Sequence, residues 1–176
     1  MKNNIFLLII LISFGCTKVV PRKPVNQKPS TTLLKATAKQ TKSLNDIEDK
    51  KIEHLIVKDS LSKYFVSQNG FWYKYIIKKE KDLPKPKIGN EVSFEYEITD
   101  LNNVIIYSKE ELGIKKYKID KEDFISAIQK GIKLMKVGET ITFVIPSYSA
   151  FGITGDGNKI GINQSIKSTI TLLNIK

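Results

Sequence analysis

The sequence predicts an α+β fold in which an antiparallel sheet wraps around one short helix. Residues 71–77 and 92–99 show the period-two alternation of side chains that is typical of strands. Residues 120–131 carry apolar side chains at helical spacing and end at a glycine, and residues 165–175 alternate again. We expect a further helix and a disordered spacer ahead of the sheet.

Residues 1–15 have the features of a secretory signal peptide. Lys2 provides a positive start, Ile5–Ile12 is an unbroken apolar run, and Cys16, the only cysteine, follows directly after Gly15. The run is too short to cross a bilayer, which takes about 20 apolar residues. A cysteine in this place resembles a bacterial lipobox, in which the thiol is acylated and becomes the new N-terminus. An ordinary signal peptide with an incidental cysteine is the alternative.

Acylation of Cys16 predicts a protein of the cell envelope, lipid-anchored to a membrane, the outer membrane, and facing the periplasm. It would leave no thiol for a disulfide, a metal site or nucleophilic catalysis, because the chain has no second cysteine. We therefore expect neither a metal nor a cofactor, and a fold that depends on its hydrophobic core.

The positive charge is concentrated just after Cys16. The chain has a net charge of +11, and seven basic residues but no acidic one lie between Cys16 and Leu44. The remainder beyond that segment holds 21 basic and 18 acidic residues. Basic residues beside a lipid anchor gain about 1 kcal/mol each from anionic headgroups. We do not expect a nucleic-acid partner, because the basic segment has no interleaved aromatic residues for base stacking.

Residues 16–42 are predicted to form the disordered basic spacer, since Lys, Thr, Pro, Gln and Ser predominate there. Residues 43–67 are predicted to form an amphipathic helix that begins at Ser43 and ends before Asn69 and Gly70. Its apolar stripe needs a partner, which is either the following domain or a second copy. His54, the only histidine, has no second ligand or triad partner beside it, and we interpret it as a solvated residue.

The remaining residues, 68–176, are predicted to form one domain. Strand 71–77 leads through a connection with two prolines to strand 92–99, which ends at the turn Asp100–Asn103. Shorter strands are expected over 104–108 and 116–119.

A helix is expected after the last of these strands. Asp120 would cap it with Asp123 in the capping-box position, and Gly131 would stop it. A strand over 140–145, a glycine-broken loop and the closing strand 165–175 complete the domain.

Three spaced motifs in this domain resemble one family. They read Gly-Ile-Lys-Leu-Met-Lys-Val-Gly-Glu up to residue 139, Ile-Pro-Ser-Tyr-Ser-Ala-Phe-Gly up to residue 152, and Ile-Lys-Ser-Thr-Ile-Thr-Leu-Leu up to residue 173. Over roughly residues 68–176 the chain resembles the FKBP-type peptidyl-prolyl cis-trans isomerases, also called rotamases. The resemblance implies an FKBP-like half-barrel of antiparallel strands around one helix, and proline-containing polypeptides as clients.

One subgroup is more similar than the rest. The lipobox, the basic spacer, the helix before the domain and the segments 104–108, 134–136 and 158–161 resemble the gliding-motility-associated FKBP-type lipoproteins of Bacteroidetes-like bacteria. This resemblance implies an isomerase that assists the folding of exported proteins of the gliding or secretion machinery.

The family resemblance also implies a catalytic pocket. Tyr96 matches the tyrosine of the second strand, Ile106 a pocket phenylalanine, and Ile160 an isoleucine of the flap. Phe124 and Ile125 match a Val-Ile pair whose second residue donates a backbone N–H to the ligand. Plain core packing is the alternative for such aromatic and branched side chains, because they usually fill interiors.

Four positions depart from the family pattern within or beside the pocket. Ile128 replaces a tryptophan floor, Phe151 a tyrosine that bonds the ligand, and in the substrate-binding positions Tyr107 replaces an aspartate and Ser168 a phenylalanine. These departures favour weak activity and poor binding of macrolide inhibitors. The alternative function is therefore a catalytically weak binding module that serves as a lipid-anchored assembly partner.

Overall fold

The structure is a computed structural model, and it describes residues 31–176. The predicted signal peptide, the predicted acylation site Cys16 and residues 16–30 of the predicted spacer lie outside the described residues. The chain divides after Thr37 into two units. The described part of the first unit, residues 31–37, is helical, and residues 38–176 form the second unit.

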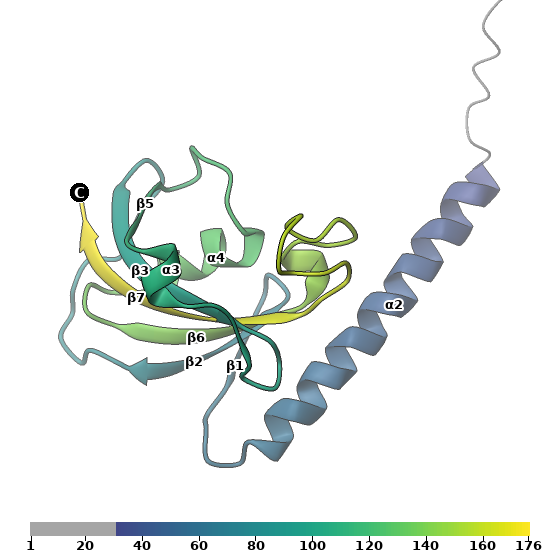
Figure 1. The fold of residues 1–176 in the computed structure, drawn as a ribbon, viewed down its shortest axis with the longest axis horizontal. Helices are drawn as coiled ribbons and strands as arrows, with labels where there is room; N and C mark the ends of the chain where they lie inside the picture. The colour runs from purple at the N-terminus through teal and green to yellow at the C-terminus, as the bar shows by residue number, and fades with distance from the viewer. Residues whose placement is uncertain (1–30) are drawn as a thin grey trace, which may run out of the picture. The chain divides into compact units, whose positions relative to one another are not determined.

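The second unit is built on an antiparallel sheet, as predicted, and this sheet has seven strands (Figure 1). The strands are β1 (Phe65–Ser67), β2 (Phe71–Ile77), β3 (Glu91–Thr99), β4 (Ile105–Tyr107), β5 (Lys115–Lys118), β6 (Thr140–Ile145) and β7 (Ile166–Ile175). They lie in the order β1-β2-β6-β7-β3-β4, and β5 also pairs with β3. β7 pairs with nearly the whole of β3, and β4 and β5 pair with opposite ends of β3.

Among residues 31–176, three α-helices and two short 3-10 helices accompany the sheet. The α-helices are α2 (Thr31–Lys58), α3 (Lys109–Leu112) and α4 (Ser126–Gly131), and the 3-10 helices are η1 (Ile132–Leu134) and η2 (Ser147–Ser149). Figure 1 shows α4 lying over the curved strands. The fold is therefore the FKBP-like α+β arrangement that the sequence predicts.

The alternation of side chains along the strands separates two apolar clusters. Phe94, Phe143 and Ile170 belong to the larger one, which also contains Ile128 of α4. The smaller cluster contains Ile52 of α2 together with Trp72 and Val144. Neighbouring residues of β2 and β6 belong to different clusters, so the larger, inner core and the smaller, outer core lie on opposite faces of the sheet.

Helix α4 packs closely on strand β6 through Gly131. A Cβ on this glycine would lie 2.5 Å from Cε1 of Phe143, so no side chain fits there. α4 ends at Gly131, as predicted, although this glycine has helical backbone angles and the chain continues as η1. The predicted cap is wrong, because α4 begins at Ser126 and Asp120 has a left-handed φ of 54°.

Helix α2 differs from the predicted helix at both ends. It includes residues 31–42, which we had assigned to the spacer, and it stops at Lys58 rather than residue 67. Ala, Leu, Lys and Gln in the early segment are strong helix formers even without an apolar stripe. Phe65 leaves the helix because it forms β1, where its ring stacks on Tyr73 at 5.3 Å.

The partner expected for the helix is present within the second unit. Ile52 is completely buried against Trp72 and Val144, whereas Leu44 and Ile47 are more than half exposed. The helix therefore packs on the outer face of the sheet over its last turns.

The other strand predictions are confirmed with small shifts. The strand expected over 104–108 stops at Tyr107, because Ser108 caps α3, a helix that the sequence did not reveal. The turn after β3 is held by Asp100, whose Oδ1 accepts hydrogen bonds from the backbone of Asn102 and Val104.

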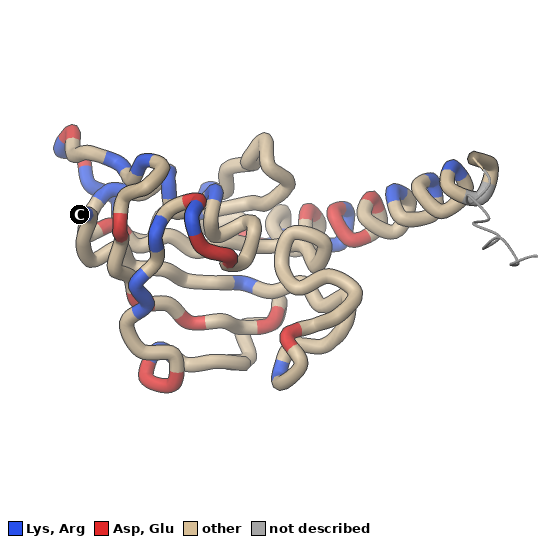
Figure 2. The backbone as a smooth tube through the Cα atoms, turned by 90° about the horizontal axis from the view of Figure 1, so that it is seen from above, with Lys and Arg blue, Asp and Glu red and all other residues tan. Residues whose placement is uncertain are grey.

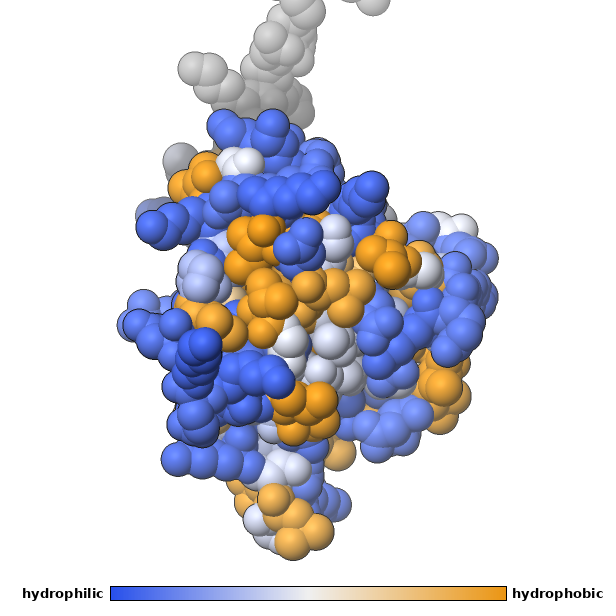
Figure 3. All heavy atoms as spheres, turned by 90° about the vertical axis from the view of Figure 1, so that its left-hand side faces the viewer, coloured by the Kyte–Doolittle hydropathy of each residue, from blue (hydrophilic) through white to orange (hydrophobic). Residues whose placement is uncertain are grey.

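Basic and acidic residues are interspersed over the second unit, and on α2 the acidic residues follow the first basic ones (Figure 2). Figure 3 shows one face on which apolar residues gather among hydrophilic ones. Within residues 31–176, no helix is long and apolar enough to cross a membrane.

Candidate active site

A pocket of about 500 Å³ opens on the inner face of the sheet. One side is formed by β3, β4 and α3, another by the segment just before α4, and the third by residues of the connection between β6 and β7. We call this connection, residues 146–165, the flap. The pocket is lined by Tyr96, Ile98, Tyr107, Leu112, Asp123, Phe124, Ile125, Ala150, Phe151 and Asp156.

Aromatic rings form the wall between β3 and the segment before α4. The ring of Phe124 meets Tyr96 edge-on at 5.8 Å, and it also contacts Phe94 and Tyr117 at 5.9 and 5.8 Å. Tyr96 and Ile98 both point to the pocket because residues two apart on a strand share a face. The surface of the pocket is therefore mainly apolar.

Two hydrogen-bond donors of the pocket have no acceptor in the part of the chain that the structure describes. One is the Tyr96 hydroxyl, and burial, with a smaller effect of Tyr107, raises the pKa of Tyr96 so that it stays protonated. The other is the backbone N–H of Ile125, which precedes α4 in an extended conformation (φ −53°, ψ 119°). Both donors are available to a carbonyl oxygen in the pocket.

Tyr107 and Asp156 form a polar pair at the mouth of the pocket. The Tyr107 hydroxyl donates to Oδ2 of Asp156 at 2.5 Å, and the amides of Asn158 and Ile160 donate to Oδ1. Partial burial opposes ionisation of Asp156, but the hydrogen bonds from Tyr107 and the two amides lower its pKa. The same bond, together with burial, raises the pKa of Tyr107. The flap thus places the carboxylate of Asp156 beside Tyr107.

The flap is folded around Asp156 by a tight turn at Gly155. Gly155 has a φ of 66°, and a Cβ there would lie 2.4 Å from the carbonyl oxygen of Ile160. That carbonyl accepts a hydrogen bond from the Asp156 amide. Glycine is required at this position for both reasons.

The structure brings five of the predicted site residues together at the pocket, namely Tyr96, Tyr107, Phe124, Ile125 and Phe151. The other four do not line it. Ile128 and Ile160 are almost completely buried in the inner core, and Ile106 is half-buried against that core. Ser168 is fully buried, and its hydroxyl donates to the Glu97 carbonyl at 3.1 Å. The roles of all nine in binding or catalysis stay predictions.

Five lining residues were missed by the sequence reasoning, namely Ile98, Leu112, Asp123, Ala150 and Asp156. The alternation of β3 could have indicated Ile98, which lies two residues after Tyr96. No local pattern indicates Asp156 or Leu112, because the flap and α3 bring them to the pocket from elsewhere in the chain.

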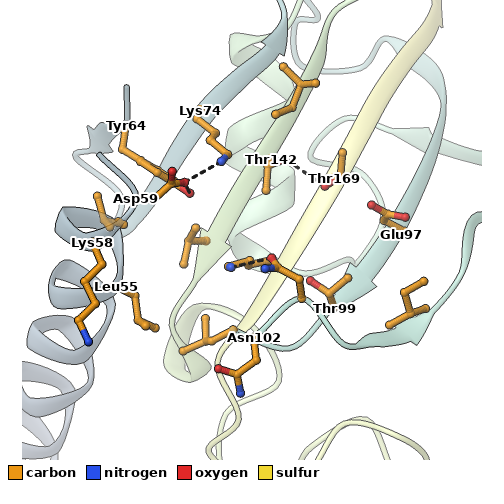
Figure 4. A pocket seen from close by; sticks show the side chains of 17 residues that line it. Leu55, Lys58, Asp59, Tyr64, Lys74, Glu97, Thr99, Asn102, Thr142 and Thr169 are labelled. Carbon is orange, nitrogen blue, oxygen red and sulfur yellow. Dashed lines mark hydrogen bonds and ion pairs between the residues drawn. The ribbon is translucent and has the colours of Figure 1, made fainter. Parts of the chain in front are cut away.

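A second cavity, of about 730 Å³, lies on the outer face of the sheet beside the end of α2 (Figure 4). Lys74 donates hydrogen bonds to Asp59 and Ser62, each at 2.9 Å, and the bond from Lys74 to Asp59 lowers the pKa of Asp59. Lys167 donates to Asn103 at 2.8 Å, and the hydroxyls of Thr142 and Thr169 are 3.0 Å apart. We call this cavity the outer groove. The polar groups of the outer groove bond to one another, so the pocket on the inner face of the sheet is the better candidate for the active site.

Within residues 31–176, the structure supports neither a metal site nor a catalytic role for His54. Among residues 31–176, no three His, Cys, Asp or Glu side chains group so that they could hold a metal ion. His54 is exposed on α2, away from the pocket.

Comparisons with known proteins concern the family and the fold of this chain. A family model described as FKBP-type peptidyl-prolyl cis-trans isomerase matches residues 83–173, which is 91 of the 176 residues. A crystal structure of a peptidyl-prolyl cis-trans isomerase from Pseudomonas syringae pv. tomato is similar, with a TM-score of 0.59, 19% identity, and coverage of 74% of this chain and 95% of that one.

FkpA from Escherichia coli is similar as well, with a TM-score of 0.61 and 22% identity. The match covers 100% of this chain and 82% of that one. At these identities the likeness concerns the fold.

Proposed function

The chain belongs to the FKBP-type peptidyl-prolyl cis-trans isomerase family, and from this premise we propose that it works at a membrane and assists the folding of exported proteins. As an isomerase of this family, it acts on proline-containing polypeptides. We propose its attachment to a membrane, the origin of its clients and the roles of its pocket residues.

The chemistry of the reaction suits an apolar pocket. An X-Pro bond isomerises in tens to hundreds of seconds without a catalyst, because its partial double bond gives a barrier of about 18–20 kcal/mol. The twisted transition state loses conjugation and is less polar than the planar amide. A site that removes water therefore favours the twisted state, and no proton transfer is needed.

The pocket supports this mechanism with its apolar lining and its two free donors. We propose that the proline ring packs between Tyr96, Phe124 and Phe151, while the Ile125 N–H holds the carbonyl oxygen of the substrate. The Tyr96 hydroxyl is a second donor to the same region. The apolar pocket with unpaired donors at its wall is the observation that carries the proposal.

Membrane attachment is proposed from the sequence around Cys16. The apolar run before it, the absence of another cysteine and the basic segment after it support a lipid anchor on the outer membrane, facing the periplasm. The resemblance to gliding-motility-associated lipoproteins further supports clients from the gliding or secretion machinery.

The anchor is tested by Cys16→Ser in the full chain, expressed in a Gram-negative host that acylates lipoproteins. The wild type should incorporate labelled palmitate and sediment with the outer membrane. The variant should incorporate none and appear in the soluble fraction. A wild type that carries no lipid, or a variant that still sediments with membranes, contradicts the anchor.

Catalytic strength is tested by a protease-coupled isomerisation assay on a short prolyl peptide. We expect measurable turnover that is inhibited only weakly by a macrolide. A folded wild type without turnover would instead support the weak binding module. A client is tested by deleting the gene in its natural host and measuring the amounts of surface-exported proteins, which should fall.

A further inference from the structure

A single carboxylate of helix α2 holds both ends of the flap. Oε1 of Glu48 accepts a hydrogen bond from the backbone N–H of Ser147 at 2.7 Å, and Oε2 accepts one from the Ser147 hydroxyl at 2.8 Å. The Ser165 hydroxyl also donates to Oε1. Ser147 is the second residue of the flap and Ser165 is the last, so Glu48 joins two positions that lie eighteen residues apart.

Ser147 connects this carboxylate to the pocket. Its carbonyl oxygen accepts hydrogen bonds from the amides of Ala150 and Gly152, at 3.0 and 2.8 Å. These two residues flank Phe151, whose side chain lines the pocket. The Gly152 carbonyl in turn accepts from Asn163 at 2.8 Å, which ties the outgoing limb of the flap to the returning one. The position of Phe151 is thus fixed through bonds that start at Glu48.

The part of α2 that bears Glu48 is itself held in place. The neighbouring Asp49 accepts a hydrogen bond from the Tyr148 hydroxyl at 2.7 Å. One turn further on, Ile52 is completely buried in the outer core. Charged groups accept stronger hydrogen bonds than neutral ones, and a half-buried carboxylate with three donors is a well-defined support.

We propose that Glu48 is a positioning residue for prolyl isomerisation, acting through Ser147 to hold Phe151 and the flap where they close the pocket. Glu48 lies outside residues 83–173, the segment that the family model matches. Helix α2, which precedes the segment that the family model matches, would therefore help to position the isomerase site.

A flap released from Glu48 would spend part of its time away from the pocket. The apparent affinity for a substrate falls by the fraction of molecules that are competent to bind it. Loss of Glu48 should therefore raise KM with little change in kcat. A purely structural role would lower the melting temperature but leave both constants unchanged well below that temperature.

The test measures kcat and KM for a short prolyl peptide with the full chain at a temperature at which every variant is folded. Glu48→Ala should raise KM about tenfold, as expected if roughly one molecule in ten keeps a closed flap. Glu48→Gln should raise KM less, because its amide offers one acceptor oxygen instead of two. Glu53→Gln, an exposed glutamate on the same helix, is the matched control and should match the wild type.

A double-mutant cycle separates positioning from general destabilisation. Ser147→Ala keeps the hydrogen bond from the backbone N–H to Glu48 and removes only the one from the hydroxyl. Ser165→Ala removes only the hydrogen bond at the C-terminal end of the flap. Each variant should therefore raise KM by about twofold to threefold. Adding either to Glu48→Ala should raise KM no further, because the shared partner is already gone. Should Glu48→Ala fail to fold, Ser165→Ala and the Glu48→Gln variant carry the test. Unchanged KM values in the folded variants, or fully additive effects in the cycle, overturn the proposal.

Discussion

Phe151 presents to the pocket a ring without a hydroxyl group, so the role that we propose for it is to exclude water rather than to bond the substrate. Phe151→Ala should lower kcat/KM about tenfold, which corresponds to about 1.4 kcal/mol of transition-state stabilisation. The protease-coupled assay measures this change. His54→Ala, on the exposed face of α2, is the control and should leave kcat/KM unchanged. Equal activity of Phe151→Ala and the wild type would contradict the desolvation mechanism.

The bond between Tyr107 and Asp156 predicts a particular dependence of stability on pH. Because the folded pKa of Asp156 is lowered, its stabilisation is complete above the unfolded pKa of about 3.9 and is lost as pH falls through the folded pKa. Tyr107→Phe should therefore lower the urea midpoint at pH 7, and the difference from the wild type should shrink towards pH 3.

At alkaline pH the dependence of stability on pH has the opposite sign. The folded pKa of Tyr107 is raised, so its stabilisation is complete below the unfolded pKa of about 10 and is lost as pH rises through the folded value. Urea titrations of both proteins from pH 3 to pH 11 measure these differences. A constant difference across the whole range would show that the bond does not contribute.

At the scale of elements, α2 packs on the sheet through the apolar side chain of Ile52, with Ile56 partly buried beside it. Ile52 is completely buried, and Ile47 on the same helix is 59% exposed. Ile52→Ala should lower the free energy of unfolding by about 2–4 kcal/mol, because it leaves a cavity in the outer core. Ile47→Ala should change it by less than about 0.5 kcal/mol. Equal effects in a urea titration would mean that the helix is not held through the outer core.

The strands were easier to predict than the helices, and particular residues show why. β2 and β3 are recognised from the alternation of their side chains and β6 from its short apolar run, and neither pattern needs a distant contact to be recognised. The ends of α2 and the start of α4 depend on tertiary contacts, since Phe65 stacks on Tyr73 and Asp120 pairs with Lys133 at 2.8 Å. Local capping rules therefore placed the start of α4 five residues too early.

At the scale of the whole molecule, the sheet separates the isomerase pocket from the outer groove. Tyr96 and Ile98 line the pocket, and Glu97 and Thr99 of the same strand line the groove. Burial and the nearby Lys74 lower the pKa of Lys167 in that groove. Lys167→Gln should leave kcat/KM within about twofold of the wild type, because the change lies on the other face. A larger loss in the isomerase assay would show that the two faces are coupled.

The pocket was predictable where it is built from strand β3 and the segment next to α4, as Tyr96, Phe124 and Ile125 illustrate. It was not predictable where distant segments close it, because the place of Asp156 depends on the fold of the flap. Ile128 and Ile160 occupy matching positions along the chain but are covered by the inner core, and spacing alone cannot distinguish a lining side chain from a packed one.

The pairing of β2 with β6 also protects the chain from association with itself. All six residues of β6, Thr-Ile-Thr-Phe-Val-Ile, are buried and none is charged. The segment 83–173 alone would lack β2 and would present the free N–H and C=O groups of β6 along an open sheet edge. Such an edge is a template for intermolecular strand pairing and amyloid-like stacking. By covering this edge, residues 71–77 therefore protect the chain from aggregation. A truncated form of the chain should stay soluble only if these residues are retained.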